Sequence, residues 1–204
     1  MERKEALRRI SELKNVDLRL LADEYEVTVF KDGKKNKGWA GHVIERFLGL
    51  AQNSSRSPNF GSWELKVIPL YYKKDGTLAV KETMAITMID QYEVRRNAFR
   101  DSHLYNKLQK ILIVSRIYVD KQETSSLLHD ITEFDLNDPK ISKQVEDDYE
   151  LIRKTIIEKG FLGLSGKIGT YIQPRTKGQG HGSTSRAFYA RKIFLEIILG
   201  LNKK

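Results

Sequence analysis

The sequence predicts an α/β protein, because segments with the helical spacing of apolar residues alternate with segments typical of strands. The clearest helix is expected at 138–160, which opens on an aspartate followed by a proline and repeats apolar residues on one face. The clearest buried strand is 110–114, a run of isoleucine, leucine and valine. A second strand is expected at 63–70, which is rich in aromatic and β-branched residues and is closed by Pro69.

Helices dominate the stretch before the 63–70 strand. The spacing of leucine and isoleucine predicts an amphipathic helix at 2–13, and Asp17 is suited to cap a second helix through residue 22. Residues 31–37 are rich in lysine and turn formers, which predicts a basic loop, either simply solvated or in contact with phosphate. Residues 38–50 predict a third helix, in which Glu45 lies among the apolar positions rather than opposite them.

Strands and one further helix are expected later in the chain. The Asp75-Gly76 turn predicts a hairpin that leads into a strand at 78–88. Residues 127–134 and 170–173 are typical of strands, whereas 188–201 has the spacing of a final amphipathic helix.

Two charged segments carry no recognised enzyme motif. We interpret the acidic run Glu146-Asp147-Asp148-Glu150 as a solvated face of the 138–160 helix. Residues 174–186 are glycine-rich, basic and free of acidic side chains, but they lack the residue order of a nucleotide-binding loop. We expect them to order on the backbone or in a groove of a nucleic acid.

The composition limits the classes of protein to which the chain can belong. At 204 residues, with 40% apolar and 31% charged residues, the chain suits one globular domain spanning 1–204. The net charge of +9 favours a polyanionic partner, nucleic acid before membrane. Cysteine is absent, no apolar run approaches the ~20 residues of a membrane span, and the amino terminus lacks the apolar core of a secretory signal. We therefore expect a cytoplasmic protein with no membrane partner.

Glu64 and Lys66 form the candidate chemical pair. Residues two apart in a strand leave the same face, so a carboxylate and an ammonium lie side by side there. Such a pair can bind a divalent metal ion and steady a hydrolytic water, as phosphodiester cleavage requires. A lone E-x-K is also an ordinary feature of a half-buried strand. The four histidines lack zinc-site spacing and no G-x-S-x-G motif occurs, which disfavours zinc and serine hydrolases.

The surroundings of this pair resemble the PD-(D/E)xK nucleases, and most closely the MutH group. That group joins a mismatch-repair nicking enzyme to type II restriction endonucleases that cut at GATC. The matching segments are 36–41, 45–49, 64–69, 102–110, 171–173 and 186–189, in the family's order and spacing. One position departs, because the family has aspartate where this chain has Asn59.

The resemblance implies a restriction-endonuclease-like fold, in which a mixed sheet flanked by helices forms two lobes around a cleft for duplex DNA. One lobe would hold the catalytic sheet, and the other would combine the amino-terminal helices with the carboxy-terminal segment. The resemblance also implies a Mg²⁺ site held by Glu45, Asn59 and Glu64. Lys66 would orient or deprotonate the attacking water, and Lys107 would be needed for full activity.

DNA-binding residues are expected at both ends of the chain. The resemblance places Arg175 and Lys177 where basic residues contact DNA, and Tyr189 where MutH has a tyrosine that senses adenine methylation. Lys37, in the basic loop, and Arg186, in the glycine-rich segment, complete the expected set.

We therefore expect a sequence-specific, Mg²⁺-dependent endonuclease of the type II restriction class, acting on double-stranded DNA at GATC or a related site. A mismatch-repair nicking enzyme that needs a MutL-like activator remains an alternative, as does a DNA-binding module that no longer cuts. We interpret Asn59 as an introduced substitution that inactivates cleavage. One metal site per chain predicts a monomer in the free form and a transient dimer on DNA when both strands are cut.

Overall fold

The structure is a computed structural model that describes residues 1–50, 61–178 and 184–202. The described residues form two compact units. The first unit contains 1–50, 61–81 and 111–133, and the second contains 82–110, 134–178 and 184–202. The expectation of a single endonuclease domain over 1–204 stays a prediction. No helix in the described part of the chain is both long and apolar enough to span a membrane.

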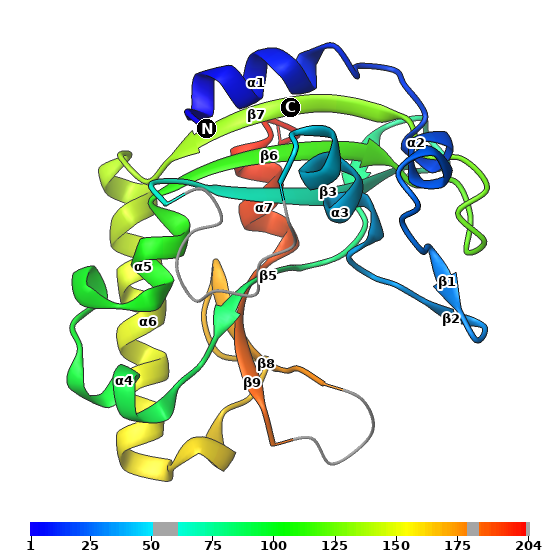
Figure 1. Cartoon of the computed structure of the whole chain (residues 1–204). Coiled ribbons are helices and arrows are strands. Elements are labelled where there is room, and N and C mark those ends of the chain that lie inside the picture. Colours follow the sequence, from blue (N-terminus) through cyan, green and yellow to red (C-terminus); the bar gives the residue numbers. More distant parts are fainter. Residues whose placement is uncertain (51–60, 179–183, 203–204) are drawn as a thin grey trace. The chain divides into compact units, whose positions relative to one another are not determined.

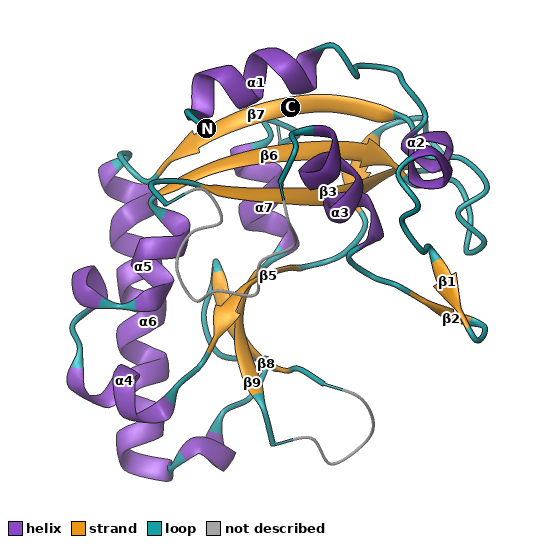
Figure 2. Cartoon of the chain, viewed as in Figure 1, coloured by secondary structure: helices purple, strands orange, loops and turns teal. Residues whose placement is uncertain are grey.

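The first unit is built on a mixed four-stranded sheet in the order β4-β3-β6-β7 (Figures 1 and 2). Its strands are β3 (Glu64–Tyr72), β4 (Leu78–Val80), β6 (Lys110–Ile117) and β7 (Leu128–Asp135). Strand β3 runs parallel to β6, with Glu64 opposite Ile111, and antiparallel to β4, with Leu70 opposite Val80. The helices are α1 (Arg3–Ser11), α2 (Leu18–Glu24) and α3 (Trp39–Phe47), and a small hairpin pairs β1 (Phe30–Lys31) with β2 (Lys34–Lys35).

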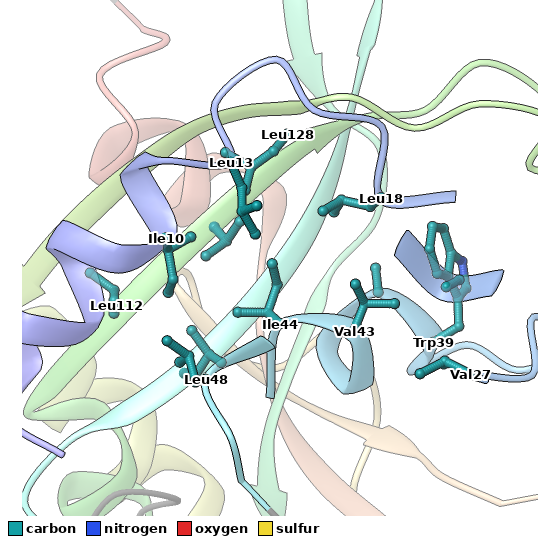
Figure 3. Packing of buried hydrophobic residues seen from close by; sticks show 14 of the residues in the cluster. Ile10, Leu13, Leu18, Val27, Trp39, Val43, Ile44, Leu48, Leu112 and Leu128 are labelled. Atoms are coloured by element: carbon teal, nitrogen blue, oxygen red, sulfur yellow. The ribbon is translucent and has the colours of Figure 1, made fainter. Parts of the chain in front are cut away.

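One apolar cluster joins α1, α2 and α3 to one face of this sheet (Figure 3). Ile10, Leu18 and Ile44 come from the three helices, and Leu112 and Leu128 come from the sheet; all five are fully buried. The amino-terminal helices therefore pack on the sheet that carries Glu64, and the expected lobe of amino-terminal helices with the carboxy-terminal segment is wrong. The reason is the match between the helices' apolar faces and the alternating apolar side chains of the sheet.

Asp17 caps α2 and ties it to a distant loop, which confirms the predicted cap. Its carboxylate accepts hydrogen bonds from the backbone N–H of Arg19 at 2.9 Å, from Ser125 Oγ at 2.6 Å and from the backbone N–H of Ser126 at 2.8 Å. Burial by itself raises the pKa of Asp17, but these hydrogen bonds, led by that from Ser125, hold the pKa below its usual value.

The second unit contains a three-stranded sheet in the order β5-β9-β8. Its strands are β5 (Met84–Met88), β8 (Ile172–Thr176) and β9 (Arg186–Ala190), all paired antiparallel. Its helices are α4 (Gln91–Arg96), α5 (His103–Leu108), α6 (Pro139–Lys159) and α7 (Lys192–Ile198), with 3₁₀ turns η1 (Phe99–Asp101) and η2 (Phe161–Gly163). The long helix α6 packs against α4 and β8. Mixed sheet pairing flanked by helices confirms the α/β class.

Two predicted elements extend or divide differently in the structure. Strand β3 continues through Pro69, whose carbonyl accepts from the Lys81 N–H and therefore faces the β4 side. A proline nitrogen is tolerated there because β4 pairs only with the last three residues of β3. The expected 78–88 strand is two strands in different sheets, β4 and β5, separated by residues 81–83.

In two other segments the structure has a different kind of element from the one predicted. The expected basic loop at 31–37 contains a hairpin, because Asp32 and Gly33 both take positive φ angles, 51° and 69°, and turn the chain tightly. The helix expected at 188–201 begins only at Lys192, since the residues up to Ala190 pair with strands on both sides. Sheet pairing therefore overrides the helical periodicity of that segment.

Candidate functional site

Glu64 and Lys66 lie side by side at the start of β3, on the face away from the amino-terminal helices. Leu65 and Val67 point into the apolar cluster of α1, α2 and α3, so the alternate residues point the other way. The Lys66 Nζ atom lies 2.8 Å from Glu64 Oε1. Glu64 is 1% exposed, whereas the Lys66 side chain keeps 20% of its surface exposed.

This arrangement places a buried carboxylate under a partly accessible ammonium. A buried carboxylate is stable only when it is paired and hydrogen-bonded, and Lys66 supplies one of its partners. On the other edge of β3, the described strand β4 pairs only with Leu70–Tyr72. Among the described residues, no strand therefore borders the Glu64 end of β3 on that edge. The pair can accept a cation or donate to an oxygen nucleophile from its accessible side.

The expected metal ligands are not seen as one cluster among the described residues. Glu45 is half-buried on α3, which packs on the Leu65 face of the sheet, opposite to the face of Glu64. Asn59 lies outside the described residues. Within the described ranges, no cluster of three or more histidine, cysteine, aspartate or glutamate side chains could hold a metal ion. The Glu64 carboxylate has the chemistry of a Mg²⁺ ligand, because Mg²⁺ takes oxygen ligands and usually completes its shell with substrate phosphate and water.

Lys107 and Lys37 lie in different surroundings. Lys107 is 5% exposed on α5, in the second unit, and the Ser102 hydroxyl caps that helix by accepting from the Tyr105 N–H at 3.1 Å. Lys37 is exposed in the first unit, just before α3. The Asn36 side chain accepts from the Gly38 N–H at 3.1 Å and fixes the turn that presents Lys37.

The structure brings the other expected DNA-binding residues together on the β8–β9 hairpin. Arg175 pairs with Ala187 in register, and Tyr189 lies on the neighbouring strand with its ring centroid 5.6 Å from the Arg175 guanidinium carbon. Arg175 also donates to Thr83 Oγ1 at 2.8 Å. Burial raises the pKa of Tyr189, so its hydroxyl stays protonated and can donate at neutral pH.

Lys177 and Arg186 lie at the end of the same hairpin that leads into residues 179–183. The Lys177 N–H donates to the Ser185 carbonyl at 3.0 Å, and Arg186 pairs with Thr176. Cationic side chains therefore follow both strands toward residues 179–183, which lie outside the described residues. The hairpin offers an aromatic ring, a guanidinium and further cations on adjacent strands, which is a combination suited to nucleic acid.

A family model described as "DNA mismatch repair enzyme MutH" matches residues 48–154, more than half of the chain. The chain belongs to the MutH family. It is 27% identical over 191 residues to the DNA mismatch repair protein MutH of Vibrio cholerae O395, covering 91% of this chain and 83% of that protein. It is 29% identical over 199 residues to MutH of Haemophilus ducreyi, covering 88% and 84%. Membership confirms the resemblance inferred from the sequence.

Among solved structures, the chain is similar to a restriction endonuclease MvaI–cognate DNA substrate complex. The identity is 13% and the TM-score is 0.37, with 89% of this chain and 95% of that chain covered.

One acidic residue of this MutH-family chain has a role that the sequence analysis missed. Asp148 is 2% exposed, so the interpretation of the acidic run as a solvated face is wrong for this residue. Its carboxylate accepts from three successive backbone N–H groups, those of Thr170, Tyr171 and Ile172. The helical spacing of the sequence could have indicated this burial, because Asp148 lies three residues after buried Val145 and belongs to the apolar face of α6.

A buried ion pair in the first unit was also missed. Arg116 Nη1 and Nη2 lie 2.7 Å and 3.0 Å from the two carboxylate oxygens of Glu123, and Lys35 pairs with the same carboxylate. Arg116 also donates to Ser126 Oγ at 2.7 Å, and its guanidinium carbon lies 5.0 Å from the centroid of the Trp39 ring at the start of α3. This cluster joins the β1–β2 hairpin, the 118–127 loop and the helix that carries Glu45.

Proposed function

We propose that this chain is a Mg²⁺-dependent endonuclease that recognises a specific sequence in duplex DNA and cuts one strand per protomer. The observation that carries the proposal is the Glu64–Lys66 pair, with its 2.8 Å contact on a buried strand of a MutH-family chain. Neither the E-x-K spacing nor family membership alone specifies a reacting group, but together they support the proposal that this pair is the reacting group.

Each residue of the proposed site has a distinct task. Glu64 would hold Mg²⁺ together with the residue at position 59, and the ion would supply positive charge to the scissile phosphate and an acidified water. Glu45 completes the proposed ligand set on the ground of the family resemblance alone, since its helix packs on the other face of the sheet. Lys66 donates to Glu64 and has accessible surface left, so it can donate a second hydrogen bond that holds the attacking water in place. Lys107 is proposed to be needed for full activity.

DNA binding is assigned to two surfaces. The β8–β9 hairpin would place Arg175 and Tyr189 at base edges and Lys177 and Arg186 at phosphates. Lys37 would contact phosphate from the first unit. The net charge of +9 supports this assignment, since neutralising phosphates releases counterions and drives association.

Two biological forms of this activity differ in what they cut. The type II restriction form would cut both strands at GATC or a related site, as a free monomer that pairs transiently on DNA. The mismatch-repair form would nick one strand after activation by a MutL-like protein. The names of the curated relatives, such as the Vibrio and Haemophilus proteins above, favour the second form.

Position 59 decides whether this chain itself can cut. An asparagine offers a carbonyl oxygen without charge, so Mg²⁺ should bind more weakly than it would beside an aspartate. We propose that Asn59 is an inactivating substitution and that the Asn59→Asp variant restores cleavage. A DNA-binding module that never cuts is the alternative.

The test is Mg²⁺-dependent digestion of a plasmid of mixed sequence by the chain and by its Asn59→Asp variant, followed by sequencing of the ends. Breaks at one short sequence would support the restriction form, and nicks that require an added MutL-like protein would support the repair form. Cleavage that persists after Lys66→Ala would remove Lys66 from the site. No cleavage by either protein with MutL-like protein and Mg²⁺ present, while both bind DNA, would refute the proposed endonuclease.

A further inference from the structure

We propose that Asp148 is a positioning residue for DNA recognition: its buried carboxylate fixes the start of β8 and thereby the register in which Arg175 and Tyr189 are presented. The inference rests on the proposed function, because it takes the β8–β9 hairpin to be the surface that reads DNA. All of the residues involved lie in the second unit.

The contacts of the carboxylate are directional. Oδ1 accepts from the Thr170 N–H at 2.8 Å, and Oδ2 accepts from the N–H groups of Tyr171 at 2.6 Å and Ile172 at 2.7 Å. The Gln144 side-chain amide donates to Oδ1 at 3.1 Å from one turn earlier in α6. All four donors are neutral, so Asp148 is held by directional hydrogen bonds and not by an ion pair. Three of these bonds go to the backbone at the start of β8 and therefore fix where this strand begins.

The turn before β8 has no room to adjust. Gly169 takes a φ angle of 80°, and a Cβ at this position would lie 1.8 Å from the Ile172 carbonyl oxygen and 3.3 Å from Asp148 Cγ. Only glycine therefore allows the chain to pass this close to the carboxylate. On the far side of the turn, the Tyr171 ring stacks on Phe194 with centroids 4.9 Å apart and planes 4° apart.

This anchor lies immediately upstream of the DNA-reading residues. Ile172 is both a donor to Asp148 and the first residue of β8, where it pairs with Ala190. Arg175 follows three residues later, about 10 Å along a strand. Side chains alternate across a strand, so a slip of one residue against β9 would turn Arg175 to the opposite face and separate it from Tyr189.

The experiment compares Asp148→Asn with Asp147→Asn. Asparagine keeps the shape of Asp148 but presents an NH₂ group to a backbone N–H, so one or more of the three hydrogen bonds must break. Asp147 is the matched control, because it lies on the same helix with its side chain 52% exposed, in a surface pair with Lys143. The unmodified protein first selects its preferred sequence from a duplex library with a random centre. Each variant is then titrated against that duplex and a scrambled one at a temperature where circular dichroism shows it folded.

We expect Asp148→Asn to lose about 10- to 100-fold in affinity for the selected duplex, the effect of losing one or two base contacts, and less than about 3-fold for the scrambled duplex. Asp147→Asn should change neither. If Asp148→Asn only lowers the melting temperature and keeps the ratio of the two affinities, Asp148 is merely structural and the inference is wrong.

A second variant covers the case in which Asp148→Asn does not fold. Asp148→Ser keeps one hydroxyl acceptor without placing an NH₂ group against the backbone donors, and we expect it to reduce the affinity ratio in the same way. A folded Asp148→Ser protein with the ratio unchanged would overturn the inference. If the unmodified protein enriches no sequence from the library, the proposed sequence-specific function fails first, and the inference fails with it.

Discussion

Replacing Glu123 with glutamine should destabilise the first unit strongly, because it removes a negative charge that lies against both Arg116 and Lys35. The side chains of Arg116 and Glu123 are 5% and 0% exposed, so water cannot take over the role of the carboxylate. Breaking a buried ion pair by removing one partner costs about 3–5 kcal/mol. Glutamine keeps the size of the side chain and one acceptor oxygen, which places the expected loss near the lower end of that range.

Tryptophan fluorescence during urea unfolding measures this loss in the right place, because both tryptophans of the chain, Trp39 and Trp63, are buried in the first unit. A loss of about 3 kcal/mol should lower the urea midpoint by about 1–3 M, given slopes of about 1–3 kcal/mol per molar urea.

Asp130→Asn is the control for this measurement. It removes the pair between Lys14 Nζ and Asp130 Oδ1, which is 3.0 Å long but has side chains 55% and 56% exposed. Its expected cost is about 0–1 kcal/mol, and less in high salt. Equal midpoints for Glu123→Gln and Asp130→Asn would refute the reasoning, since burial would then make no difference to the two pairs.

The remaining predictions concern cleavage, binding and pH. Lys66→Ala in an Asn59→Asp background should abolish Mg²⁺-dependent cleavage and leave duplex affinity nearly unchanged, because its effect lies in the transition state; wild-type turnover would contradict this. Lys177→Ala should weaken binding to all duplexes alike and reduce by about 1 the slope of log affinity against log salt concentration. Arg175→Ala should instead cost about 1–3 kcal/mol of binding free energy on the preferred site only. A mobility-shift titration that shows equal losses on preferred and other duplexes for both variants would refute this difference in roles. Because hydrogen bonds hold the pKa of Asp17 below its usual value, its ionised form contributes stability above pH ~4 that is lost as the pH falls through the lowered pKa. The melting temperature of Asp17→Asn should therefore lie below that of the unmodified protein at pH 7 and approach it near pH 3; a gap that stays constant would exclude this origin.

Local sequence rules predicted most of the helices and strands. They failed where pairing with a distant strand decides whether a segment becomes a strand or a helix. The capped helix α6 and the strand β6 carry their signals within a few residues, so spacing alone located them. Strand β9 does not, because it is a strand only where it pairs with β5 and β8, and its sequence also fits a helix. Pairing between distant segments is not visible in a short window of sequence.

The same limit applies to the candidate site. The shared face of Glu64 and Lys66 follows from the period of a strand and was predictable. The burial of Asp148 was not predicted, because three of the four groups that donate to its carboxylate are backbone N–H groups that lie after the end of α6. Backbone donors have no residue type that could be recognised, so only the fold shows that the charge is satisfied.

The parallel pairing of β3 with β6 also constrains how the protein can be made. During synthesis, Glu64 and Lys66 leave the ribosome well before Ile111, the residue that pairs with Glu64, and residues 82–110 of the second unit emerge in between. Non-local parallel pairing of this kind forms slowly and leaves strand edges open in the meantime. A nascent chain that stops before Lys110 would therefore contain the Glu64–Lys66 pair but lack the neighbouring strand, with an apolar edge available to chaperones or to aggregation.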